Sequence, residues 1–286
     1  MPGAASLSGC KNFSIPGQGT SSPSAPGLSS LCGMRVFLFV LICVQWIACA
    51  STAPAETVSV AAAADLVFCL EAMDASFEKA HPDIKIQVTT GSSGNFFAQI
   101  KNGAPFDLFL SADVGYPRQL AEGGFAEKDT LVTYAFGRLV LWAANPNLDL
   151  QRGLPLLSDP AVRKIAIANP DHAPYGRAAK AALEHEKLWD PLQPKIVLGE
   201  NIAQAMQFAQ SGNADVGLVA LSLARSVRVA GKERYFEVPE DFYPRLEQTA
   251  IITKHGAANA SAKVFLEYLR GAEGRKVLEE YGFKVP

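Results

Sequence analysis

Four short turns in the sequence place small or hydroxyl-bearing residues between a strand pattern and a helix pattern. They are centred on Ala64-Asp65, Ser92-Ser93, Pro174-Tyr175 and Asn201-Ile202. A helix that begins at such a turn has unpaired backbone N–H groups in its first turn, and its peptide dipoles give that end a partial positive charge. Oxyanions bind there without a lysine or arginine. One such turn is more often a plain helix cap, so the fourfold repetition carries the prediction of an anion site.

The first half of the chain has the periodicity needed to position two of these turns. Small and apolar residues at 58–64 predict a buried strand, and Asp65 stands where the N-cap of the next helix is expected. Apolar residues then recur at helical spacing up to Pro82. Strand patterns at 84–88 and 106–110 flank a helix pattern that follows Gly94. This alternation predicts a parallel sheet covered by helices on both faces.

The second half repeats the pattern. Strands are predicted at 138–144, 164–168, 196–198 and 216–220, and helices begin near Arg177 and Ile202. We therefore predict an α/β fold of two lobes, each a mostly parallel sheet flanked by helices. A last strand at 248–253 and helices at 260–270 and 273–281 are expected to return to lobe one. Open α/β sheets bind ligands at the carboxyl ends of their strands, so the four turns should meet in the cleft between the lobes.

The N-terminal region predicts secretion. Residues 1–33 are rich in Gly, Ser and Pro and are expected to be unstructured, with Met34 as an alternative start. Residues 34–50 combine a positive head with a short apolar run and are predicted to be a signal peptide, with cleavage as late as residue 55. Lipidation at Cys49 is the alternative. Lobe one is then expected to comprise 56–136 plus 245–286, and lobe two 137–244.

Composition and motifs exclude several classes of protein. The chain has 286 residues and a formal net charge of −2, and it lacks the basic runs of a nucleic-acid-binding surface. Its four histidines have no metal-ligand spacing, and no nucleophile elbow or phosphate-binding loop is present. We therefore expect no enzyme activity, no cofactor and no direct protein ligand to a metal. Cys69 is the one cysteine beyond residue 50, so no internal disulfide is expected.

Several motifs in order resemble the molybdate-binding proteins of ABC transporters, over residues 57–286. They are 62–66, 91–107, Ser111-Ala112-Asp113, the turn 169–176 and Tyr281-Gly282-Phe283. The resemblance implies a two-lobed type II periplasmic binding protein with its ligand in the cleft. Such a protein is expected to capture molybdate or tungstate as a monomer in the periplasm and to deliver it to a membrane permease with its ATPase. Molybdenum would be present only as the bound oxyanion.

The resemblance also implies ligand contacts. They fall on Asp65, Ser93, Tyr175 and Ile202, with Ala64, Ser92 and Asn201 as possible additional contacts. Ser93 is expected to offer its hydroxyl and its N–H group, and Tyr175 and Ile202 their backbone N–H groups. Hinges near 133–137 and 239–244 would allow the lobes to close on the anion.

Two positions depart from the family pattern. Many relatives have Ser or Asn where this chain has Asp65, and many have a tyrosine where it has Ala220. An ionised carboxylate would repel a dianion by about 4 kcal/mol at about 4 Å if the effective dielectric constant is near 20. We predict that Asp65 caps its own helix and presents only its N–H group, so that the site takes deprotonated dianions. The alternative is that Asp65 accepts a hydrogen bond from hydrogen phosphate or arsenate.

Other readings of the same fold remain open. Ser92, Asn95 or Asn201 could replace the missing tyrosine donor. The ligand could be another tetrahedral oxyanion, namely sulfate, phosphate or arsenate, because cavity size is what would distinguish molybdate from sulfate. A secreted enzyme on this fold is a lower alternative. An effector-sensing domain of a transcription regulator would need a DNA-binding motif, and a sugar site would need stacked aromatic residues, neither of which the sequence offers.

Overall fold

The structure is a computed structural model that describes residues 55–227 and 234–286. The predicted unstructured segment 1–33, the signal peptide 34–50 and the possible lipidation site Cys49 lie outside the described residues.

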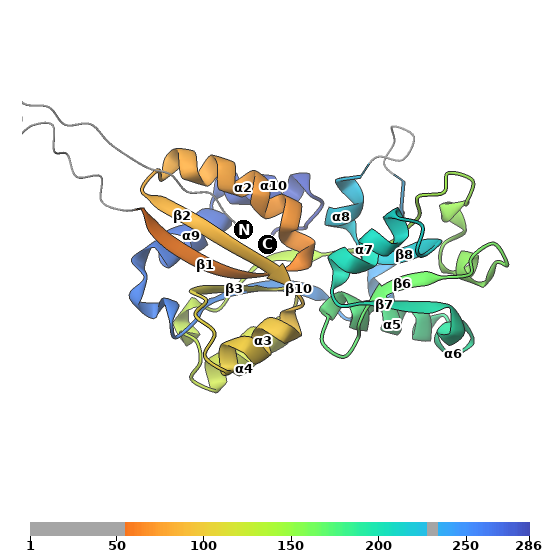
Figure 1. Ribbon diagram of the computed structural model, residues 1–286, viewed down its shortest axis with the longest axis horizontal. Coiled ribbons are helices and arrows are strands. Elements are labelled where there is room, and N and C mark those ends of the chain that lie inside the picture. Colours follow the sequence, from red (N-terminus) through yellow and green to blue (C-terminus); the bar gives the residue numbers. More distant parts are fainter. Residues whose placement is uncertain (1–54, 228–233) are drawn as a thin grey trace, which may run out of the picture. The chain divides into compact units, whose positions relative to one another are not determined.

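The first sheet has the strand order β2-β1-β3-β10-β4 (Figure 1). The bounds are β1 (Glu56–Ala63), β2 (Ile84–Gly91), β3 (Leu108–Ser111), β4 (Val132–Gly137) and β10 (Leu246–Ile252). Strand β1 pairs in parallel with β2 on one side and β3 on the other. Its inner half is almost entirely Ala and Val, which suits a strand buried on both faces.

Helices cover both faces of this sheet. On one face pack η1 (Ala64–Leu66), α2 (Val67–Ala80), α9 (Ala260–Arg270) and α10 (Ala272–Glu280), and on the other α3 (Ser93–Lys101) and α4 (Gly115–Glu122). The apolar stripe of α2 is buried, as Leu70, Met73 and Phe77 are each at most 2% exposed. Each such side chain stabilises the fold by about 1.5–3 kcal/mol. Helices α9 and α10 share this core with α2, so the C-terminal helices pack on the first sheet.

The second sheet has the order β7-β6-β8-β5-β9. Its strands are β5 (Leu139–Trp142), β6 (Ile165–Ala168), β7 (Ile196–Gly199), β8 (Val216–Ala220) and β9 (Phe236–Glu237). The associated helices are α5 (Pro174–His185), α6 (Trp189–Leu192), α7 (Ile202–Gln210) and α8 (Leu221–Arg225). Short 3-10 helices complete the described chain: η2 (Lys128–Thr130), η3 (Leu150–Arg152), η4 (Leu154–Ser158), η5 (Gln193–Lys195), η6 (Glu240–Phe242) and η7 (Gly256–Ala258).

Both sheets are mixed, which corrects the expectation of mostly parallel sheets. In each sheet two pairings are parallel and two are antiparallel. Every antiparallel pairing involves β10 or β5, the strands next to the points where the chain passes between the sheets. Antiparallel neighbours need no helical crossover, so the chain can change sheets over a short distance. The α/β architecture of two sheets flanked by helices is as predicted.

The helices of residues 55–227 and 234–286 include none with the length and apolar character required to cross a membrane.

Candidate anion-binding site

The four predicted turns each follow the carboxyl end of a strand. They join β1 to η1, β2 to α3, β6 to α5 and β7 to α7. The structure brings their residues around one small cavity. Its lining comprises all seven residues singled out from the sequence, namely Ala64, Asp65, Ser92, Ser93, Tyr175, Asn201 and Ile202, together with Ala63, Gly91, Ala112, Ala173 and Pro174.

The donors at this cavity are backbone groups. Ser93 and Ile202 are the first residues of α3 and α7, and Tyr175 is the second residue of α5. Their N–H groups have no carbonyl one turn earlier in the helix to pair with. The lining contains no lysine, arginine or histidine. The arrangement can therefore bind a small anion through oriented N–H dipoles from both lobes.

Ser93 adds a hydroxyl to these donors. Its side chain is 1% exposed, and its Oγ accepts a hydrogen bond of 3.0 Å from the N–H group of Ala112. An accepted bond leaves the hydroxyl proton available. This is the hydrogen bond that the Ser93 side chain forms within residues 55–227 and 234–286. The Ser93 hydroxyl can therefore donate to a ligand in the cavity.

The three candidates for replacing the missing tyrosine have other partners. The Ser92 hydroxyl donates to the carbonyl oxygen of His172 at 2.7 Å, and its Oγ lies 2.8 Å from Nδ1 of the same residue. The Asn95 Nδ2 donates to Glu200 at 2.6 Å. The Asn201 Oδ1 accepts from the N–H group of Gln204 at 3.0 Å and so caps α7. These side chains hold the segments around the cavity in place, so Ser93 is the residue whose hydroxyl can donate to a ligand.

Asp65 does not cap its own helix, so that prediction is wrong. The chain enters α2 through the 3-10 turn η1, whose N-cap is Ala63 and whose end has no side-chain cap. Asp65 lies inside this turn, and its Oδ2 accepts a hydrogen bond of 2.7 Å from Nε2 of Gln248. The side chain does turn inward, as expected, and is 1% exposed. Gln248 is a fully buried residue of β10, and nothing in its position along the sequence indicates this contact with Asp65.

Burial dominates the electrostatics of Asp65. Loss of water raises the pKa of its carboxyl to about 6, against smaller opposite effects of the nearby Tyr175 hydroxyl and of Gln248. Neither Asp65 Oδ1 nor the Tyr175 hydroxyl forms a hydrogen bond of ordinary geometry with another described residue, but the two groups lie close enough for the hydroxyl to lower the pKa of the carboxyl. Sequence reasoning assigned only a backbone role to Tyr175. In the structure its buried ring also fills the space beside Gly137, where an added Cβ would lie 2.3 Å from the Tyr175 hydroxyl oxygen.

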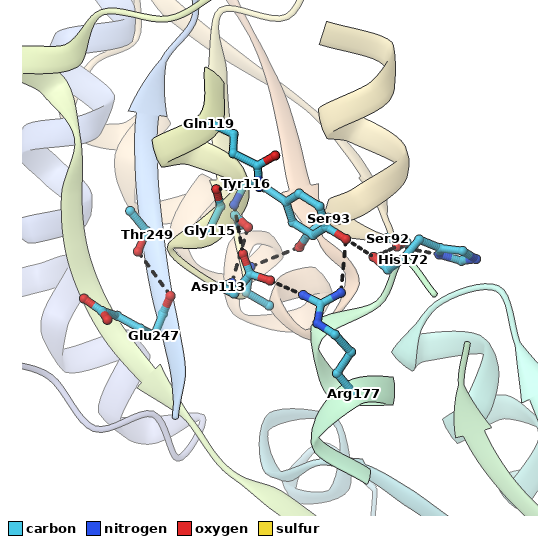
Figure 2. A network of polar contacts seen from close by, with 12 residues as sticks. Ser92, Ser93, Asp113, Gly115, Tyr116, Gln119, His172, Arg177, Glu247 and Thr249 are labelled. Atoms are coloured by element: carbon cyan, nitrogen blue, oxygen red, sulfur yellow. Dashed lines mark hydrogen bonds and ion pairs between the residues drawn. The ribbon is translucent and has the colours of Figure 1, made fainter. Parts of the chain in front are cut away.

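Hydrogen bonds across the cavity hold the two lobes closed (Figure 2). The carbonyl oxygen of His172, in lobe two, accepts the N–H group of Gly94 at 2.9 Å in addition to the Ser92 hydroxyl. Arg177 of α5 forms an ion pair with Asp113 and donates to the Tyr116 hydroxyl at 3.1 Å. The sequence did not identify these bridging contacts, because nothing in residue spacing shows which polar residues of two lobes will meet.

No three His, Cys, Asp or Glu side chains in residues 55–227 and 234–286 are grouped so that they could hold a metal ion directly. Cys69 is a buried thiol of the lobe-one core, and burial raises its pKa well above the usual range. It therefore packs as a small apolar residue.

Comparison with known proteins identifies the family. Residues 58–284 match the model of the bacterial extracellular solute-binding proteins. The chain is 42% identical to the molybdate-binding protein ModA of Rhodobacter capsulatus over 195 residues, which cover 68% of this chain and 75% of that protein. It is 38% identical to ModA of Azotobacter vinelandii over 238 residues, covering 83% and 92% of the two chains.

A solved structure agrees with these sequence relatives. The periplasmic molybdate-binding protein of Azotobacter vinelandii superimposes with a TM-score of 0.75 at 36% identity, covering 80% of this chain and 99% of that one. These relatives are named as binding proteins, not enzymes. With a family model matched along nearly all of the described chain and relatives of this similarity, the chain belongs to the bacterial extracellular solute-binding protein family.

Proposed function

We propose that this protein captures molybdate or tungstate in the periplasm and delivers it to an ABC permease and its ATPase. The observation that carries the proposal is the convergence of four strand-to-helix turns on one small cavity without a cationic side chain. A doubly charged tetrahedral anion suits such a site, because many oriented N–H groups replace its hydration shell. The similarity to molybdate-binding proteins supports molybdate as the anion, and the relative named as periplasmic supports that location.

In the proposed complex the anion is held by both lobes. Lobe one would contribute the hydroxyl and N–H group of Ser93 and the backbone at Ala64 and Asp65. Lobe two would contribute the N–H groups of Tyr175 and Ile202. Ser92 and Asn201 line the cavity, but their side chains bond elsewhere, and we assign them the role of holding the wall in place.

Capture would proceed by closure. The chain passes between the sheets at Arg138, and again between β9 and β10. Residues 133–137 belong to β4 and pair with β10, so the first hinge is better placed at Arg138 than in the expected segment. An anion bound to one lobe would accept hydrogen bonds from the N–H groups of the other lobe and so favour the closed conformation. The permease would then recognise the closed protein.

Titration calorimetry of the purified protein with molybdate, tungstate, sulfate and phosphate tests the proposed function. We expect tight binding of molybdate and tungstate and much weaker binding of sulfate, because the charge is the same and the cavity selects by size. Phosphate should be rejected. Preference for sulfate or phosphate would assign the protein to another oxyanion, and absence of binding to all four would refute the function.

Replacement of Ser93 by Ala tests the donor set. We expect the affinity for molybdate to fall about tenfold to a hundredfold, since a hydrogen bond to a charged group contributes about 1.5–3 kcal/mol. Ser76→Ala is the matched control, because Ser76 of α2 bonds to Tyr268 on the outside of lobe one. Equal affinities of the two variants would contradict the assigned role of Ser93.

Replacement of Gly94 by Ala tests closure. An added Cβ would lie 2.6 Å from the His172 carbonyl oxygen of the other lobe. The variant should therefore close poorly and bind molybdate at least about tenfold more weakly. Because the Cβ would also lie 2.7 Å from the Tyr116 hydroxyl oxygen of lobe one, the thermal stability of the unloaded variant is measured alongside, and a large loss there would indicate a clash within lobe one. Gly115→Ala is the control, since its Cβ would meet nothing closer than 3.6 Å. Unchanged affinity of Gly94→Ala would show that closure does not require this contact.

Replacement of Arg177 by Met tests the ion pair between the lobes. The Arg177 and Asp113 side chains are 40% and 19% exposed, so a contribution of about 1 kcal/mol is expected. Stopped-flow measurement of release should show dissociation of molybdate accelerated about fivefold, with a smaller difference from the parent protein at high salt. Arg152→Met removes a comparable ion pair to Asp159 within lobe two and should leave release unchanged.

A further inference from the structure

The carboxyl group of Asp65 lies in the seam between the lobes, behind the anion cavity. From lobe one, Gln248 of β10 donates to it, and the Tyr134 hydroxyl of β4 donates in turn to Gln248 Oε1 at 3.2 Å. From lobe two, the Ser222 hydroxyl of α8 donates to the Asp65 backbone carbonyl at 2.7 Å. The Tyr175 side chain of α5 faces the carboxyl group itself. The environment of Asp65 is therefore completed only when the lobes are together.

No positive charge in the described structure compensates an ionised Asp65. The titratable groups that face it are Tyr134, Tyr175 and the thiol of Cys69 on α2, with Tyr243 beyond Tyr175. Burial raises the pKa of both Tyr134 and Tyr175 well above the usual value, so both stay neutral.

The hydrogen bonds at Asp65 also suit the protonated form. An ionised, buried carboxylate requires several donors, but only Gln248 forms a hydrogen bond of ordinary geometry to it, at Oδ2. The Tyr175 hydroxyl is the second donor within reach, and it lowers the pKa of Asp65 by less than burial raises it. Oδ1 is buried without a hydrogen-bond partner among the described residues, and so is the hydroxyl oxygen of Tyr175. A proton on Oδ1 would give the carboxyl a donor of its own, with the Tyr175 oxygen as its nearby acceptor. Burial already raises the pKa of Asp65 to about 6 without a bound anion.

Closure onto an anion changes the surroundings of Asp65 in two ways that disfavour its ionised form. The arrival of Tyr175 and Ser222 removes water, and a dianion enters the cavity that Asp65 lines. The Tyr175 hydroxyl also acts in the opposite direction as a hydrogen-bond donor, but its effect on the pKa is smaller than that of burial. We infer that closure of the lobes on the oxyanion takes up one proton from solvent at Asp65, and that the loaded protein holds this carboxyl neutral. On opening, the proton returns to solvent together with release of the anion.

The sign of the resulting pH dependence follows from linkage. In the open form Asp65 is ionised near neutral pH, and in the closed form it is protonated, so binding is favoured by protons. The affinity for molybdate should therefore weaken as the pH rises toward the pKa of the loaded form and become constant above it. The inference rests on the proposed function only for the identity of the anion.

The test is calorimetric titration of the full mature chain with sodium molybdate in pairs of buffers with different ionisation enthalpies. We expect uptake of a large fraction of one proton near about pH 6.5, falling toward zero by about pH 9, with affinity weakening by up to about tenfold per pH unit over the range of uptake. Tight binding with no uptake at any pH in this range would overturn the inference and leave the proposed function intact. Failure to bind molybdate at all would instead refute the function.

Asp65→Asn is the decisive variant, because its amide resembles the protonated carboxyl and keeps an acceptor for Gln248. We expect it to bind molybdate without proton uptake, and at about pH 8.5 at least as tightly as the parent protein. Asp107→Asn is the matched control, since Asp107 is a buried carboxyl whose partners Ser59 and His255 both lie in lobe one. Its proton uptake should equal that of the parent.

Two further measurements keep the result unambiguous. His172 also lies between the lobes, and its Nε2 is 3.7 Å from a carboxylate oxygen of Glu200. If Asp65 is the group that takes up the proton, His172→Gln should retain the uptake. Loss of uptake in that variant would overturn the assignment to Asp65.

Titration with phosphate distinguishes proton uptake from the alternative in which Asp65 accepts a hydrogen bond from a proton carried by the ligand. Tight phosphate binding that Asp65→Asn abolishes would refute our inference.

Discussion

A dianion can be held away from water without a cation only if many weak dipoles point at the same place. A single helix end supplies a fraction of a unit charge, and that contribution is screened in water. The structure therefore depends on bringing strand-to-helix turns of both sheets to one cavity and on excluding water from it. The short helices at these turns, the small residues of β1 and β6 and the close packing around them all serve this convergence.

Backbone groups as well as side chains form the hydrogen bonds that hold the two lobes together. The carbonyl oxygen of His172 accepts hydrogen bonds from the Gly94 N–H group and from Ser92, both in the other lobe. Glycine is required at 94 because a side chain would occupy the position of that carbonyl. The ion pair between Arg177 and Asp113 lies at a more exposed place and adds to a contact that the backbone already makes. Binding of the anion and docking of the lobes are thus parts of one event.

Asp65 shows how a site that uses no cation can still contain a carboxyl. Its charge would oppose that of the anion, yet it lies in the lining of the cavity. The conflict is resolved by its surroundings, in which Gln248 and neutral tyrosines replace water and burial raises its pKa. A group that is ionised in the open protein and neutral in the closed one makes protons a second ligand of the same conformational change.

The sequence by itself determined the two α/β halves and the four strand-to-helix turns, because strand and helix periodicity and turn chemistry are local properties. The seven site residues were implied by the resemblance to molybdate-binding proteins, and all of them are among the residues that line the cavity. It did not determine the antiparallel strands at the crossings, the partner of Asp65, or the contacts made by Gly94, His172 and Arg177. The strong preference of aspartate for helix N-caps predicted a capping role for Asp65. In the structure Asp65 lies inside a 3-10 turn and accepts a hydrogen bond from the buried Gln248 instead. Only the tertiary structure decides such matters, since they depend on which distant segments meet and on how much water their meeting removes.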